Sequence, residues 1–159
     1  MKDVLFDIYD SAGGVVVGDT PTIVNFDSSR YIDSHSSLDS GEISVTPPTS
    51  RIMPPDYYVL LMMCKVTLAV SSGSSRTQTK AWIEYDNGGG FVPIPGIEGY
   101  MYNRTLDAGW GTVNLNTTFQ KHKRDVDRTT FRVMVQRVSG SSTIITQANA
   151  SNILCLIHY

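Results

Sequence analysis

The sequence has no long hydrophobic run, few charged residues and little net charge. No stretch approaches the roughly 18 apolar residues of a membrane-spanning helix, and the segment after Met1 lacks the apolar core and cleavage site of a signal peptide. Charged residues make up 18% of the 159 residues, and the net charge is −2. Such a chain has no basic field that would attract nucleic acid. We therefore expect a soluble domain that binds neither membrane nor nucleic acid.

Cysteine is scarce as well. Cys64 and Cys155 lie far apart, and each sits inside an apolar, strand-like run. A disulfide scaffold would need more cysteines and evidence of secretion. We favour two buried free thiols, because cysteine often serves as a small core residue. A bridge between neighbouring strands is the alternative.

Motifs of catalysis and metal binding are also missing. The three histidines are scattered: His35, His122 and His158. None has metal-ligand spacing to another ligand, and no nucleophile elbow, zinc-protease motif or phosphate-binding loop is present. We predict no catalytic residue, no metal site and no cofactor.

A Ser-rich stretch at residues 33–42 contains three acidic side chains, Asp33, Asp39 and Glu42. Clustered oxygen ligands of this kind could bind calcium. The spacing of an EF-hand is absent, so we favour a solvated loop.

The residues that are present favour β-structure. Apolar and polar side chains alternate in residues 81–85, 113–119 and 131–135, and turn-forming residues separate such runs at 71–75 and 86–90. Period-two alternation indicates strands with one covered face, and many short strands at this spacing indicate a sandwich or barrel. We predict strands at residues 4–9, 15–18, 22–27, 42–46, 57–70, 79–86, 91–94, 98–103, 112–119, 130–138, 143–146 and 152–158.

Two runs are apolar on both faces, residues 59–64 and 153–157. The first continues on a single face as Val66, Leu68 and Val70. A strand that is apolar on both faces must be covered on both. In a two-layer sandwich the second cover has to come from outside, so we expect another subunit there.

Two surface features suggest contacts with other molecules. The densest basic cluster consists of Lys121, Lys123, Arg124 and Arg128, partly neutralised by Asp125 and Asp127. It is either a solvated loop or a contact for an acidic partner surface. Tyr100 and Tyr102 share one strand face, and Trp110 follows in a turn. Exposed aromatic residues of this kind favour interfaces or sugar binding, and core packing is the alternative.

The order of several segments resembles the C1q/TNF-like jelly rolls over roughly residues 20–158. The segments are residues 23–26, Tyr31, 41–45, the proline-led 52–60, 131–140 and 151–157. Two positions depart from the pattern, because Asp56 stands where a glycine usually precedes the tyrosine and Cys155 replaces a small glycine. No collagen-like stalk precedes the domain, which speaks against a complement-type role.

The resemblance implies an all-β, two-sheet antiparallel jelly roll that forms a homotrimer. We predict an N-terminal arm or edge strand at residues 1–14 and the jelly-roll domain at residues 15–159. The expected trimer-interface residues are Tyr58, Leu60, Met62, Phe131, Val133, Leu154 and Leu156.

Small jelly rolls of this form resemble phage and viral surface proteins. We expect a capsid decoration (cement) protein on the virion surface, with itself and the major capsid protein as partners. The expected capsid contacts are Val4, Phe6, Lys121, Lys123, Arg124 and Arg128. The alternative is a receptor-binding tail-fibre tip that recognises host glycan or protein with Tyr100, Tyr102 and Trp110. A small enzyme on the same scaffold is disfavoured, since no histidine cluster or carboxylate pair stands out.

Overall fold

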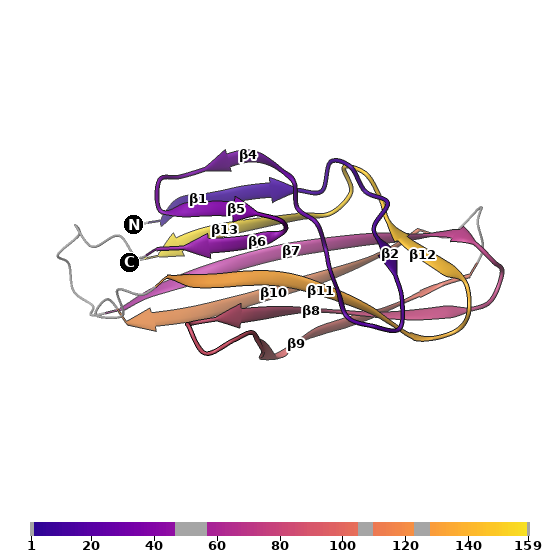
Figure 1. Ribbon diagram of the computed structural model, residues 1–159. Helices are drawn as coiled ribbons and strands as arrows, with labels where there is room; N and C mark the ends of the chain where they lie inside the picture. Colours follow the sequence, from indigo (N-terminus) through magenta and orange to yellow (C-terminus); the bar gives the residue numbers. More distant parts are fainter. Residues whose placement is uncertain (1, 47–56, 105–109, 123–127, 159) are drawn as a thin grey trace.

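The computed structural model describes residues 2–46, 57–104, 110–122 and 128–158. These ranges form two antiparallel sheets packed face to face (Figure 1). None of the described residues belongs to a helix that could cross a membrane. The predicted two-sheet antiparallel sandwich is therefore confirmed.

Sheet A has seven strands. Six of them follow the order β2-β12-β7-β13-β1-β4, and the seventh, β10, also pairs with β7. The strands are β1 (Lys2–Tyr9), β2 (Val16–Val17), β4 (Ser28–Ile32), β7 (Tyr57–Ser72), β10 (Gly111–His122), β12 (Thr143–Thr146) and β13 (Asn152–His158). Since Lys2 pairs with His158, β1 begins where β13 ends, at one end of the sandwich (Figure 1).

Sheet B has six strands in the order β5-β6-β11-β8-β9, and β3 also pairs with β11. The strands are β3 (Thr22–Ile23), β5 (Ser36–Asp39), β6 (Glu42–Val45), β8 (Thr77–Asp86), β9 (Val92–Asn103) and β11 (Thr129–Ser139). The two predicted strands at 91–94 and 98–103 are one continuous strand, β9, with a register shift against β8 between Trp82 and Glu84.

The prediction of an N-terminal arm or edge strand is wrong for residues 2–9. Strand β1 lies inside sheet A, between β13 and β4. Its apolar side chains Leu5, Phe6 and Ile8 are buried in the core. Removing large apolar side chains from water stabilises the fold by about 1.5–3 kcal/mol each, so this segment is an integral part of the domain.

The Ser-rich stretch 33–42 is not a solvated loop throughout, because it contains β5 and the start of β6. Asp39 pairs with Glu42 across a two-residue turn in which Ser40 and Gly41 both have positive φ, 51° and 80°. Turns of this type match the twist of a β-hairpin. The Ser-Gly pair is the sequence signal for this hairpin. The two strands beside it are hard to recognise from the sequence because serine has a weak strand propensity.

The core lies between the two sheets. In β7 the even-numbered side chains from Leu60 to Val70 are all buried. Opposite them, Phe131 packs edge-on against Phe119, with ring centroids 5.3 Å apart. The predicted trimer contacts Leu60, Met62, Phe131 and Val133 belong to this core and are 0% exposed. Placing them at a subunit interface is therefore wrong, since they have no surface to offer a second copy.

Both cysteines are buried and free, which confirms the preferred interpretation. Cys64 pairs in register with Ile153, and Cys155 pairs with Met62. The two thiols are thus diagonal neighbours on adjacent strands. A disulfide needs Cβ atoms about 3.5–4.5 Å apart, whereas diagonal pairs lie about 7–8 Å apart, so this arrangement does not bridge.

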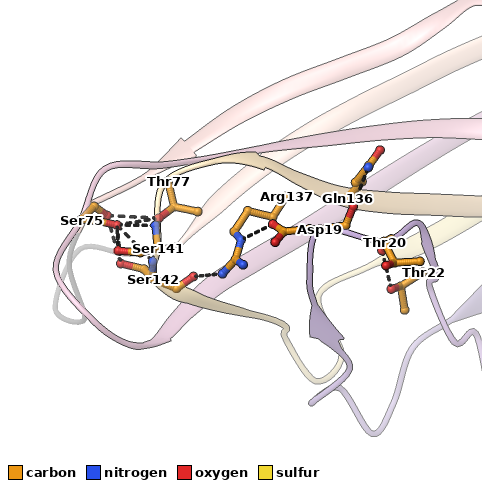
Figure 2. Close-up of polar contacts among 9 residues, drawn as sticks. All are labelled: Asp19, Thr20, Thr22, Ser75, Thr77, Gln136, Arg137, Ser141 and Ser142. Atoms are coloured by element: carbon orange, nitrogen blue, oxygen red, sulfur yellow. Dashed lines mark hydrogen bonds and ion pairs between the residues drawn. The ribbon is translucent and has the colours of Figure 1, made fainter.

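A hydroxyl cluster joins two turns at the end of the sandwich where β7 meets β8 (Figure 2). Oγ of Ser75 accepts hydrogen bonds from the backbone N–H groups of Ser141 (2.8 Å) and Ser142 (3.0 Å). Nearby, Nε of Arg137 donates to Oδ1 of Asp19 at 2.9 Å. These contacts fix the β7–β8 turn against the β11–β12 turn and tie residues 18–20 to sheet B.

Candidate interaction surfaces

The outer face of sheet A carries an apolar patch. Its members point away from the core: Val4, Val59, Leu61, Met63, Leu154 and Leu156. Val4 is 39% exposed and Met63 38% exposed, and the other four are half-buried. We call these six residues the apolar patch.

The strand register makes the patch continuous. Val4 pairs with Leu156, and Leu156 pairs with Leu61, so the three form one row across β1, β13 and β7. Leu154 and Met63 form the next row. Residues opposite each other in neighbouring strands share a face and touch. The patch therefore spans three adjacent strands of sheet A.

Polar residues border the patch on both sides. The outward side chains of β10 are exposed and uncharged: Thr112, Asn114, Asn116, Thr118 and Gln120. On the other side, Arg30 of β4 donates two hydrogen bonds to the carboxylate of Asp7, at 2.9 and 3.0 Å. An apolar centre inside a polar rim is the usual anatomy of a protein–protein interface.

A groove of about 960 Å³ continues from the patch over β1 and β4. Two of its lining residues, Val4 and Leu154, belong to the patch. The others are mostly polar: Asp3, Asp7, Arg30, Tyr31, Ile32, Asp33, Ser34 and His35. The patch and the groove together make the outer face of sheet A both apolar and indented.

The predicted interface residues lie on two different faces of the structure. Leu154 and Leu156 lie on the outer face as expected, but in β7 the outward residues are Val59, Leu61 and Met63. The side chain of Tyr58 lies outside the described part of the structure. The sequence already indicated that the even-numbered residues of β7 face the core. The apolar face that includes Leu60 and Met62 continues as Val66, Leu68 and Val70, and a face that is apolar along the whole strand is the core face.

The outer face of sheet B is different, with exposed aromatic and charged side chains. Tyr100 and Tyr102 are 50% and 51% exposed, and they pair with Lys80 and Gln78 of β8. The guanidinium of Arg76 lies 4.1 Å from the ring centroid of Tyr102, a cation–π geometry. Tyr100 and Tyr102 are therefore on the surface, and the core-packing alternative does not hold for them.

Two ion pairs order this face. Nζ of Lys80 lies 2.8 Å from Oε2 of Glu98, and the hydrogen bond from Lys80 lowers the pKa of Glu98. Deeper in the same face, Glu84 accepts hydrogen bonds from Nε1 of Trp82 (2.9 Å) and Nε of Arg132 (2.7 Å). These contacts connect β8 to β9 and to β11 on this face.

Trp110 is the most exposed of the predicted receptor contacts, at 67%. It precedes β10, while Tyr100 and Tyr102 lie on β9. All three predicted receptor contacts are surface residues.

Of the predicted capsid contacts whose side chains the structure describes, Val4 and Arg128 lie on the surface and Phe6 does not. Phe6 is 0% exposed and lies in the core, so its assignment as a contact is wrong. Val4 belongs to the apolar patch, and Arg128 is exposed immediately before β11. The side chain of Lys121, and Lys123 and Arg124 entirely, lie outside the described residues.

Within the described ranges, no three His, Cys, Asp or Glu side chains come together as metal ligands. In the Ser-rich stretch, for which calcium binding was the disfavoured alternative, Oδ1 of Asp33 accepts the backbone N–H of His35 at 2.9 Å, whereas Asp39 and Glu42 lie at the tip of the β5–β6 hairpin.

No protein-family model matches the sequence, and no curated protein is significantly similar to it. Solved structures do match the fold. Murine APRIL at pH 8.0 superposes with a TM-score of 0.59 at 9% identity, covering 100% of both chains. The Eiger TNF of S. frugiperda gives a TM-score of 0.55 at 11% identity, covering 97% of this chain and 90% of that one. The chain thus has a TNF-like jelly-roll fold, as the resemblance implied, and identities this low establish the fold alone.

Proposed function

We propose that this chain is a non-enzymatic structural protein that assembles as a homotrimer through the apolar patch on sheet A. We further propose that the trimer decorates the outer surface of a viral capsid. The observation that carries the first proposal is the continuous row Val4–Leu156–Leu61 with its neighbours Leu154 and Met63, which an isolated chain leaves partly in water.

Physical chemistry supports a second copy as the cover. Contiguous apolar surface rimmed by polar groups marks interaction sites in soluble proteins. Each of the patch residues would gain about 25 cal/mol for every Å² that an interface removes from water. A closed trimer, the assembly implied by the C1q/TNF-like resemblance, would cover this patch in all subunits alike.

The assembly is tested by measuring the mass in solution with light scattering. We expect three times the single-chain mass of 17.5 kDa. The double variant Leu61→Glu/Leu156→Glu places carboxylates in the patch, and burying unpaired charge is costly, so this variant should be monomeric. Val138→Glu, at an exposed valine of β11 outside the patch, is the matched control and should stay trimeric. A monomeric wild type, or a trimeric double variant, would refute the proposal.

The virion role is tested separately. Quantitative mass spectrometry of purified virions should find this chain in a copy number comparable to that of the major capsid protein. A copy number far below that would contradict a decoration role. The double patch variant should still fold but should no longer stabilise virions against heat.

A receptor-binding tail-fibre tip is the second candidate, favoured by one observation. The exposed Tyr100 and Tyr102 lie on the outer face of sheet B, opposite the apolar patch, and would stay accessible in a patch-mediated assembly. Alanine at Tyr102 and Trp110 should then reduce host adsorption. Unchanged adsorption would exclude this role, while a low copy number in virions would favour it over decoration.

A further inference from the structure

A small pocket on the outer face of sheet A lies beside the apolar patch. Its volume is about 340 Å³, and it is lined by Tyr9, Arg30, Lys65, Asn149 and Asn152. Tyr9 pairs with Asn152, and Asn152 pairs with Lys65, so these three form one row across β1, β13 and β7. That row lies two residues along the strands from Leu154 and Met63 of the patch.

The lining is positively charged. Arg30 and Lys65 contribute two cations, and none of the five lining residues is acidic. Lys65 is exposed and forms no ion pair with any residue that the structure describes. Because Asp7 pairs with Arg30, Lys65 supplies the net positive charge of the site, and a cation without a counter-ion in a concave site attracts anions.

The second cation is held in place. Asp7, which does not line the pocket, accepts two hydrogen bonds from Arg30 through Nε and one terminal nitrogen. The guanidinium carbon lies 5.8 Å from the ring centroid of Tyr9. This geometry uses two of the five N–H groups of Arg30 and leaves the others to donate elsewhere.

Two amides complete the set of donors. Asn152 is at the start of β13, and Asn149 is in the preceding turn with a positive φ of 58°. The backbone N–H of Asn149 donates to the carbonyl oxygen of Asp10 at 2.7 Å, which anchors the turn. Side-chain amides, a guanidinium and an ammonium together are the donors that recognise a carboxylate, sulfate or phosphate.

We propose that the pocket of Tyr9, Arg30, Lys65, Asn149 and Asn152 binds a small oxyanion, either a free anion or the acidic group of a sugar. Its volume is at the lower end of the roughly 300–1,000 Å³ of ligand pockets, which suits a single acidic monosaccharide or an inorganic anion. The site is complete within one chain and does not depend on the proposed assembly.

The test is titration of the full chain, followed by NMR, with sodium glucuronate, sulfate and phosphate in separate arms over a chloride background. We expect saturable shifts confined to the five pocket residues. Tighter binding of glucuronate would assign an acidic sugar, and tighter binding of sulfate or phosphate would assign those groups. Lys65→Gln should weaken binding about tenfold through loss of a charge-assisted hydrogen bond.

Lys80→Gln is the matched control, a lysine on the opposite sheet, and should leave binding unchanged. Equal binding by Lys65→Gln, or no saturable binding up to about 10 mM of any of the three anions, would overturn the proposal. The mass of each sample in solution is measured as well, which distinguishes failure of anion binding from failure of the proposed trimer. The variant Leu61→Glu/Leu156→Glu, which should be monomeric, should bind the anion as the wild type does.

Discussion

Gly99 of β9 lies directly against Val113 of β10, where the edge of sheet B meets the edge of sheet A. A Cβ atom on Gly99 would overlap Cγ2 of Val113 and touch Leu115. Val113 and Leu115 are both core residues. Glycine at this position therefore allows the two sheets to approach at their β9–β10 edge.

Gly99→Ala should consequently destabilise the fold by about 1–3 kcal/mol, the usual cost of overpacking a core. Urea denaturation measures the change. Gly89→Ala is the control, since a Cβ on Gly89 meets no atom within 4 Å. The double variant Gly99→Ala/Val113→Ala should lose less than the sum of the single losses, because Val113→Ala removes the clash. Additive losses would contradict the close contact.

Loss of Arg132 should be costly because its partner Glu84 is largely buried. Arg132→Gln removes the 2.7 Å contact to the carboxylate of Glu84, whose side chain is 11% exposed. Hydrogen bonds to charged groups contribute about 1.5–3 kcal/mol, and we expect a loss of stability in that range. Lys80→Gln, which breaks the solvent-screened pair with Glu98, should cost less. Equal losses would show that the burial of Glu84 has no energetic effect.

Acid stability should depend on Asp19. The hydrogen bond from Arg137 and the charge of that guanidinium lower the pKa of Asp19 below its ordinary value of 3.8. Since the folded-state pKa is the lower one, this contribution is fully present above the unfolded-state pKa. It is lost as the pH falls through the folded-state pKa.

Asp19→Asn and Arg137→Gln should therefore each flatten the dependence of unfolding free energy on pH below about pH 4. The double variant should change the slope no further than either single one, because both remove the same pair. Denaturation at several pH values measures this. A slope that steepens in either single variant would contradict the assigned direction.

The two cysteines should be unreactive in the folded protein. Burial raises the pKa of Cys64 to about 12, and burial together with the charge of Asp33 raises the pKa of Cys155 as well. The thiolate is the reactive form, so a disulfide reagent at pH 8 should label neither cysteine before unfolding and both after it. A Thr118→Cys variant, with its thiol on the exposed face of β10, should react at once. Rapid labelling of the native wild type would show that one of the buried thiols is accessible.

Much of the fold could be predicted from local pattern. The alternation in residues 81–85, 113–119 and 131–135 reports which face of a strand is covered, and all three lie in long strands of the structure. The hairpin of β5 and β6 escaped notice because its serine-rich strands have low propensity, and pairing with β11 stabilises them from outside. Placement of β1 inside sheet A also depended on a distant partner, β13.

The candidate surfaces, too, were indicated partly by the sequence and partly by strand pairing. That the runs 59–64 and 153–157 are apolar on both sides is a property of the sequence, and it implied a covered outer face. Which residues form that face depends on register: Leu61 and Leu156 are partners on the outside, while Leu60 and Met62 fill the core. The anion pocket could not be inferred, because Tyr9, Arg30 and Lys65 are far apart in the chain and meet only through the pairing of β4, β1, β13 and β7.

The sequence by itself thus determined the all-β class and the apolar character of two strands on both faces, since side-chain alternation is a local property. The tertiary structure decided which apolar side chains face outward, where glycine is required and which charged side chains line one pocket. These depend on strand pairing between distant segments, and a shift of one residue in register would exchange the core and outer faces of a strand.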